Sequence, residues 1–142
     1  MLFRSVVIEG NSEKKPLEIE LGRFQDSDCG MIIEDISFAS QVVAPSGKTV
    51  FFHDHGGMVN WLKDKSFRDS AVIWVYTLDS KRWVDGKSAY YSLDESTPMN
   101  YGFGAYENST PKRVGFEEMS RRMLNGETLN NPKTRALILG DR

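Results

Sequence analysis

The residues best able to do chemistry are one cysteine, two histidines and several methionines. Cys29 is the only cysteine of the chain, and Met31 follows it two residues later. A thiolate and a thioether are the soft donors of proteins, and soft donors select Cu(I) over harder ions. His53 and His55, the only histidines, are also two residues apart. Alternate residues of a strand point to the same side, so each pair could reach one ion.

Two further methionines extend this donor set. Met58 follows two glycines, and Met99 follows a proline in a predicted turn. The sequence therefore suggests a Cu(I) site whose donors come from six residues: Cys29, Met31, His53, His55, Met58 and Met99. Zn(II) is the alternative, because one cysteine with two histidines suits zinc, and the methionines would then be spectators. The simpler alternative is that the methionines pack in the core and the histidines are solvated.

Composition excludes several other functions. The chain has 142 residues and a formal net charge of −2, without the basic face that nucleic-acid binding requires. No apolar run approaches the length of a membrane span. Asp54 lies between the two histidines, but no nucleophile, base and orienting residue can be assembled around it. We therefore expect a binding protein and not an enzyme, with Asp54 orienting an imidazole.

The elements that must position these donors are short. Residues 1–8 suggest a strand or an arm, and two helices are predicted, at 58–63 and 117–124. Met58, Trp61 and Leu62 share one face of the first helix. Strands are predicted from alternation, β-branched content and turn residues at 17–21, 38–43, 49–52, 71–76, 89–92 and 102–106.

The predicted elements occur in the same order in the two halves of the chain. Each half has a methionine after a glycine or proline, then a two-strand hairpin, then a helix with another methionine. We therefore predict an α+β fold of two small ββαβ-like units packed as one compact domain. The units are expected at residues 25–80 and 81–128, between an N-terminal arm or strand at 1–24 and a C-terminal tail at 129–142.

Five short motifs together resemble the NosL family, the copper-binding accessory proteins of nitrous oxide reductase assembly. The resemblance runs from about Asp26 to Met123 and rests on the order and spacing of the motifs. In chain order they are Cys29-Gly30-Met31, Ala39-Ser40-Gln41, Phe52-His53-Asp54-His55-Gly56-Gly57-Met58, Trp83-Val84-Asp85 and Thr97-Pro98-Met99-Asn100-Tyr101-Gly102.

The resemblance implies Cu(I) binding, membrane tethering outside the cytoplasm and copper exchange with a donating or receiving partner protein. A periplasmic location follows from it, while the residues themselves show no leader and leave a cytoplasmic location open. The single cysteine also allows a homodimer in which Cys29 of each subunit binds one metal.

The sequence departs from the family pattern at two positions. Asp26 stands where members usually carry the first cysteine of Cys-x-x-Cys-Gly-Met, and Gly57 stands where they carry another. The alternative function is therefore a NosL-like protein-interaction module without a metal, or a zinc-binding variant that uses the histidines.

Overall fold

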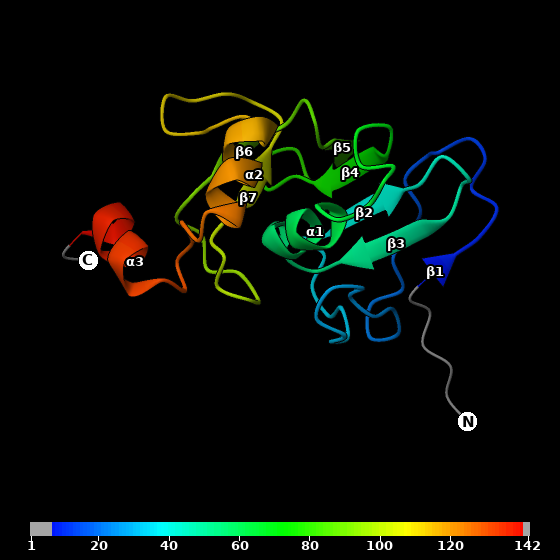
Figure 1. The fold of residues 1–142 in the computed structure, drawn as a ribbon, viewed down its shortest axis with the longest axis horizontal. Helices are drawn as coiled ribbons and strands as arrows, with labels where there is room; N and C mark the ends of the chain where they lie inside the picture. The colour runs from blue at the N-terminus through cyan, green and yellow to red at the C-terminus, as the bar shows by residue number, and fades with distance from the viewer. Residues whose placement is uncertain (1–6, 141–142) are drawn as a thin grey trace.

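The computed structural model describes residues 7–140 and shows a small α+β fold, as predicted (Figure 1). The described part of the chain forms two antiparallel sheets and three helices. Residues 1–6, in the predicted N-terminal arm, lie outside the described residues. The elements are β1 (Val7–Ile8), β2 (Ser40–Val43), β3 (Thr49–Phe52), α1 (His55–Leu62), β4 (Val72–Tyr76), β5 (Trp83–Asp85), β6 (Tyr90–Ser92), β7 (Gly104–Tyr106), α2 (Phe116–Leu124) and α3 (Pro132–Leu139).

The larger sheet has the strand order β1-β3-β2-β4-β5. Its central hairpin joins β2 to β3 through a turn at 44–48, where Gly47 adopts a φ of 91° that favours glycine. Every residue of β2 and β3 is buried, because both faces of the sheet are covered. Val50 and Phe52 pack in one core cluster, and Phe51 packs in another on the opposite face.

The main core lies between this sheet, α1 and the second half of the chain. Helix α1 packs on β2, β3 and α2, and α2 packs on β6. Fully buried Tyr91 and Phe103 bring β6 and the segment before β7 into the same cluster. The two halves therefore share one hydrophobic core, which fixes the segment 97–101 relative to α1.

The opposite face of the sheet is covered by the segment between β1 and β2. Ile19, Phe24 and Ile33 from this segment pack against Phe51. The strand predicted at 17–21 was wrong, because residues 17–20 carry no regular structure. The backbone of Leu17 instead pairs with the side-chain amide of Gln41, which donates to its carbonyl (2.6 Å) and accepts from its N–H (2.9 Å).

The predicted ββαβ order is present in the first unit as β2, β3, α1 and β4. The second unit has the same start, with β6 and β7 followed by α2, but no strand follows α2 within the described residues, so the unit lacks the final strand of a ββαβ order. Strand β5, assigned by sequence to the second unit, pairs with β4 in the larger sheet. Its Trp83 packs edge-on against Tyr76 at a centroid distance of 5.5 Å.

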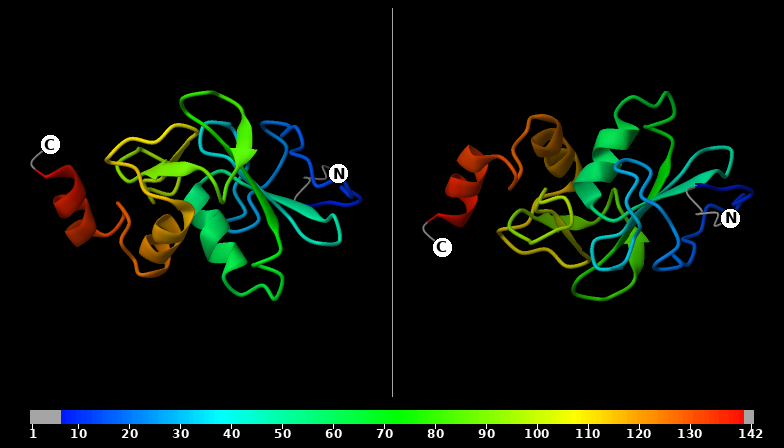
Figure 2. Two further views of the ribbon diagram at one scale, coloured as in Figure 1. Left: turned by 90° about the horizontal axis from the view of Figure 1, so that it is seen from above. Right: turned by 90° about the horizontal axis from the view of Figure 1, so that it is seen from below.

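Helix α1 begins at His55, three residues before the predicted start, because Asp54 caps it. Helix α3 occupies the predicted tail, with Asn131 as its cap and Pro132 in its first turn. Figures 1 and 2 show α3 apart from the sheets, at the end of the molecule opposite β1. No helix within residues 7–140 has the length and apolar character needed to cross a membrane.

Candidate metal centre

The predicted cysteine lies in a tight turn between two short extended segments. Gln25 and Ile32 form an antiparallel bridge, and the Asp26 N–H donates to the Met31 carbonyl (2.8 Å). Gly30 closes the turn with a φ of 79°, a conformation that side chains rarely adopt. The carboxylate oxygen Oδ1 of Asp26 accepts the backbone N–H of Cys29 at 3.1 Å. The turn therefore holds the backbone of Cys29 directly against Asp26.

Asp26 also ties this turn to the end of β3. Its Oδ2 accepts the backbone N–H of His53 at 2.8 Å, and its Oδ1 accepts a third N–H, from Asp28, at 2.7 Å. Asp26 is only 2% exposed. A buried carboxylate is costly unless it is hydrogen-bonded, and these three N–H groups supply the bonds. They fix the carboxylate between Cys29 and His53.

Three donor atoms converge at this point. The Sγ of Cys29 lies 3.3 Å from the Nε2 of His53, and that nitrogen lies 3.6 Å from the Oδ2 of Asp26. One ligand atom from each of the three residues lies within 4.8 Å of the others. His53 and Asp26 are buried, while Cys29 is partly exposed. The group therefore has one accessible side, at the cysteine.

These separations suit a bound ion. Zinc bonds of about 2.3 Å to sulfur and about 2.0 Å to nitrogen, at a tetrahedral angle, separate the two atoms by roughly 3.5 Å. The 3.3 Å between Cys29 and His53 is close to that value. Thiolate and imidazole also suit Cu(I), whereas a carboxylate is a harder donor. Asp26, Cys29 and His53 therefore form a candidate three-residue metal centre.

The protonation of Cys29 couples this centre to pH. Burial raises the pKa of its thiol; the N–H of Met31 opposes this rise, while the carboxylates of Asp26 and Asp28 add to it. A metal binds the thiolate, so binding must displace this proton. We therefore expect metal binding at Cys29 to weaken as the pH falls.

A second layer of side chains surrounds the turn. Asp28 accepts a hydrogen bond from the Nδ2 of Asn60 on α1 (2.9 Å). Tyr101 packs so closely on Gly56 that a Cβ there would lie 2.6 Å from its ring. The pKa of Tyr101 is raised by burial first, and then by the charges of Asp28, Asp54, Cys29 and Asp26. Tyr101 therefore packs on the start of α1, within range of the negative charges of the candidate centre.

Asp54 links the loop of Met99 to this region. It caps α1 by accepting the Gly56 N–H (3.2 Å), and its other oxygen accepts the Met99 N–H (2.9 Å). Asp54 is fully buried, and burial raises its pKa, which hydrogen bonds from Thr97, Met99 and Gly56 oppose. The backbone of Met99 is therefore held at the residue next to His53.

The remaining predicted ligands lie elsewhere. Met31 is 51% exposed beside the turn, and Met58 is fully buried in the main apolar core. His55 is fully buried, with its Nδ1 2.7 Å from the Ser40 Oγ and its Nε2 without a partner among the described residues. Burial lowers the pKa of His55 to about 3, so its ring is neutral near pH 7. The structure thus groups Cys29 with His53 and places His55 and Met58 inside the core.

The residue that sequence reasoning missed as a donor is Asp26. Its signal was present in the spacing Asp26-x-x-Cys29, where the resembled family carries a cysteine pair. A search of protein-family models and a search of curated proteins each returned no match to this chain.

Proposed function

We propose that this protein is a copper-binding accessory protein of the NosL type, which holds Cu(I) and passes it to a partner protein. The observation that carries the proposal is the convergence of Cys29, His53 and Asp26 at one turn. The resemblance of the motifs to the NosL family is the reason for proposing copper as the metal and the periplasm as the location. On this proposal the protein has no catalytic role.

Cys29 and His53 would supply the main bonds to Cu(I), a thiolate and an imidazole at adjacent positions. Met31, half exposed and two residues from Cys29, is a candidate third soft donor. Asp26 would hold both ligands in place through its backbone hydrogen bonds. This arrangement leaves ligand positions open for a partner.

The partial exposure of Cys29 favours a protein that transfers its metal ion to a partner over one that stores the ion. A closed cage of four protein ligands has no free position for an incoming donor, whereas an open site does. A partner thiolate could approach from the Cys29 side and displace His53 from the ion. The same opening would accept Cys29 of a second copy, giving a homodimer that shares one ion.

Zinc binding is the second candidate function, and Asp26 is the observation that favours it. Asp, Cys and His are all common zinc ligands, and the 3.3 Å between sulfur and nitrogen is near the tetrahedral value. The buried carboxylate is a better ligand for Zn(II) than for Cu(I). In this case Met31 would be a spectator.

The test is an anaerobic titration of the reduced, metal-free protein with Cu(I) against a competing chelator, with Zn(II) titrated in parallel. Cu(I) binding that is lost in both Cys29→Ser and His53→Gln supports the copper proposal. Preference for Zn(II), with Met31→Leu neutral, supports the zinc alternative. If neither ion binds, the metal function is wrong and a protein-interaction module remains.

A stoichiometry of one ion per two chains would indicate the shared dimeric site. Circular dichroism of each variant checks that it is folded. Asp35→Asn is a matched surface control, since Asp35 accepts a local backbone N–H (Ser37, 2.9 Å) as Asp26 does, but lies in an exposed loop.

A further inference from the structure

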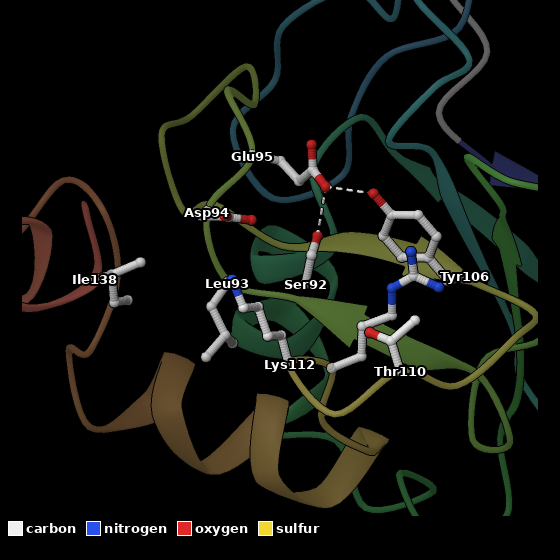
Figure 3. Close-up of a pocket in the computed structure, with 9 residues that line it drawn as sticks. Ser92, Leu93, Asp94, Glu95, Tyr106, Thr110, Lys112 and Ile138 are labelled. Atoms are coloured by element: carbon white, nitrogen blue, oxygen red, sulfur yellow. Dashed lines mark hydrogen bonds between the residues drawn. The ribbon is translucent and has the colours of Figure 1, made fainter. Parts of the chain in front are cut away.

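A polar cavity of about 430 Å³ lies in the second half of the molecule, between the β6–β7 sheet and α3 (Figure 3). Ser92 and Leu93 at the end of β6 line it, together with Glu95 and with Tyr106 of β7. None of the Asp26–Cys29–His53 group lines this cavity. Its volume is within the range of small-molecule sites.

One tyrosine fixes two opposite charges in this cavity. The hydroxyl of Tyr106 donates to the Oε2 of Glu95 at 2.5 Å, and the Ser92 hydroxyl donates to the same oxygen at 2.8 Å. The guanidinium of Arg113 lies over the Tyr106 ring, 3.5 Å from its centroid. A nitrogen of Arg113 also donates to the carbonyl of Asn108 at 2.8 Å. Both charged groups are therefore held in place before any ligand arrives.

These two charges do not neutralise each other. Glu95 and Arg113 form no ion pair with one another in the part of the chain that the structure describes. Burial and the hydrogen bond to Glu95 raise the pKa of Tyr106 to about 12, so its hydroxyl stays a donor at neutral pH. The second oxygen of Glu95 and several N–H groups of Arg113 are left without partners among residues 7–140.

The rest of the cavity supplies a further cation and an apolar wall. Lys112 lines it and makes no hydrogen bond or ion pair with any described residue. Leu93 and Ile138 of α3 also line it, and Figure 3 shows Lys112 and Leu93 between Glu95 and α2. Two carboxylates, Asp94 and the fixed Glu95, therefore line this cavity together with two cations, Lys112 and Arg113, and with two aliphatic side chains.

We propose that this cavity binds a free α-amino acid with an apolar side chain. The ammonium group would bind Glu95, the carboxylate would bind Arg113 and Lys112, and the side chain would contact Leu93. Charge-assisted hydrogen bonds at both ends of the ligand give specificity for a molecule that carries both charges. Fixing Glu95 and Arg113 on Tyr106 lowers the entropic cost of binding. This inference is independent of the metal centre.

The test uses isothermal calorimetry and amide chemical shifts of the metal-free full chain, titrated with leucine, N-acetyl-leucine and leucinamide. Metal-free protein is required because amino acids chelate copper and zinc. We expect leucine to bind and both blocked analogues to bind at least roughly tenfold more weakly, since each loses one charge-assisted contact. Shifts are expected at Leu93, Glu95 and Lys112.

Equal binding of N-acetyl-leucine would show an anion site, and equal binding of leucinamide a cation site; either result overturns the proposal. No binding of leucine at about 10 mM also overturns it. Arg113→Gln and Glu95→Gln should each weaken leucine binding roughly tenfold or more. Arg23→Gln, which removes an exposed arginine paired with Glu20, is the matched control and should change nothing.

Discussion

The Sγ of Cys29 lies 3.3 Å from the Nε2 of His53, although the two residues are 24 positions apart in the chain. The pairing depends on Asp26, whose two carboxylate oxygens accept the backbone N–H groups of Cys29 and His53 separately. The donor pair is therefore set by one buried side chain that bridges two loops. This dependence makes Asp26 the most informative position to change.

Asp26→Asn should destabilise the fold and weaken metal binding together. The amide keeps one acceptor oxygen but turns an NH₂ group toward a backbone N–H, which leaves a buried donor unsatisfied at a cost of about 1–3 kcal/mol. Urea unfolding measures the loss of stability. The exposed Asp35→Asn control should change stability by less than about 0.5 kcal/mol. An Asp26→Asn protein as stable as the parent would contradict the bridging role.

Met58 is expected to act as a core residue and not as a ligand. It is fully buried in the main core, so Met58→Ala should lower the free energy of unfolding by about 2–5 kcal/mol. Met58→Leu conserves volume and should cost less than about 1.5 kcal/mol, with unchanged Cu(I) affinity. A weaker Cu(I) affinity in a stable Met58→Leu protein would instead assign the sulfur to the metal.

Stability should fall in mild acid because of His55. Burial lowers its pKa in the folded protein to about 3, below the ordinary histidine value of 6.5. The unfolded chain therefore binds the proton more readily, and the stabilising contribution, complete above pH 6.5, is lost as the pH falls toward 3. Between pH 7 and pH 5 the loss is about 2 kcal/mol.

Urea unfolding at several pH values measures this effect. The same series on His55→Gln serves as the control, because glutamine does not titrate. The difference in slope between the two proteins isolates His55 from the carboxylates. Parallel slopes from pH 7 to pH 5 would contradict the assignment.

Gly56→Ala should displace the loop at Tyr101. A Cβ at Gly56 would lie 2.6–2.8 Å from three carbons of the Tyr101 side chain, so helix and loop must separate. We expect a loss of about 1–3 kcal/mol, measured by urea unfolding. Gly115→Ala is the matched control, since that glycine also lies at a helix N-terminus, has negative φ and has nothing within 4 Å of a Cβ. Equal effects would show that the Tyr101 contact is unimportant.

The sequence was informative where a local pattern determines structure. The β2–β3 hairpin and α2 are close to their predicted ranges, because turn residues and periodicity specify them locally. The spacing of Met58, Trp61 and Leu62 predicted the helix and the face that these residues share, and the structure shows that this face packs in the core. The strand predicted at 17–21 is absent from the structure. The backbone of Leu17 is instead hydrogen-bonded by the side chain of Gln41, which is distant in sequence. Helix α3 has weak periodicity, and its signal was the Asn131-Pro132 start.

The candidate centre was predicted in part. Soft-donor chemistry selected Cys29 and His53, which the structure brings together. Asp26 was not predicted as a donor, because carboxylates are common along the sequence and nothing local sets this one apart. Its burial depends on a contact with the end of β3, 27 residues away. The sequence gives no reason to prefer His53 or His55 as a metal ligand. In the structure, the start of α1 turns His55 toward Ser40 in the core.

The pairing of β5 with β4 has a consequence for aggregation. The sequence of β4, Val-Ile-Trp-Val-Tyr, is uncharged, β-branched and aromatic, the composition of segments that self-associate when their edges are exposed. Trp83, Val84 and Asp85 cover that edge. A fragment ending at residue 80 would expose the backbone of β4 to other chains, so the second half of the protein keeps the first from forming intermolecular sheets.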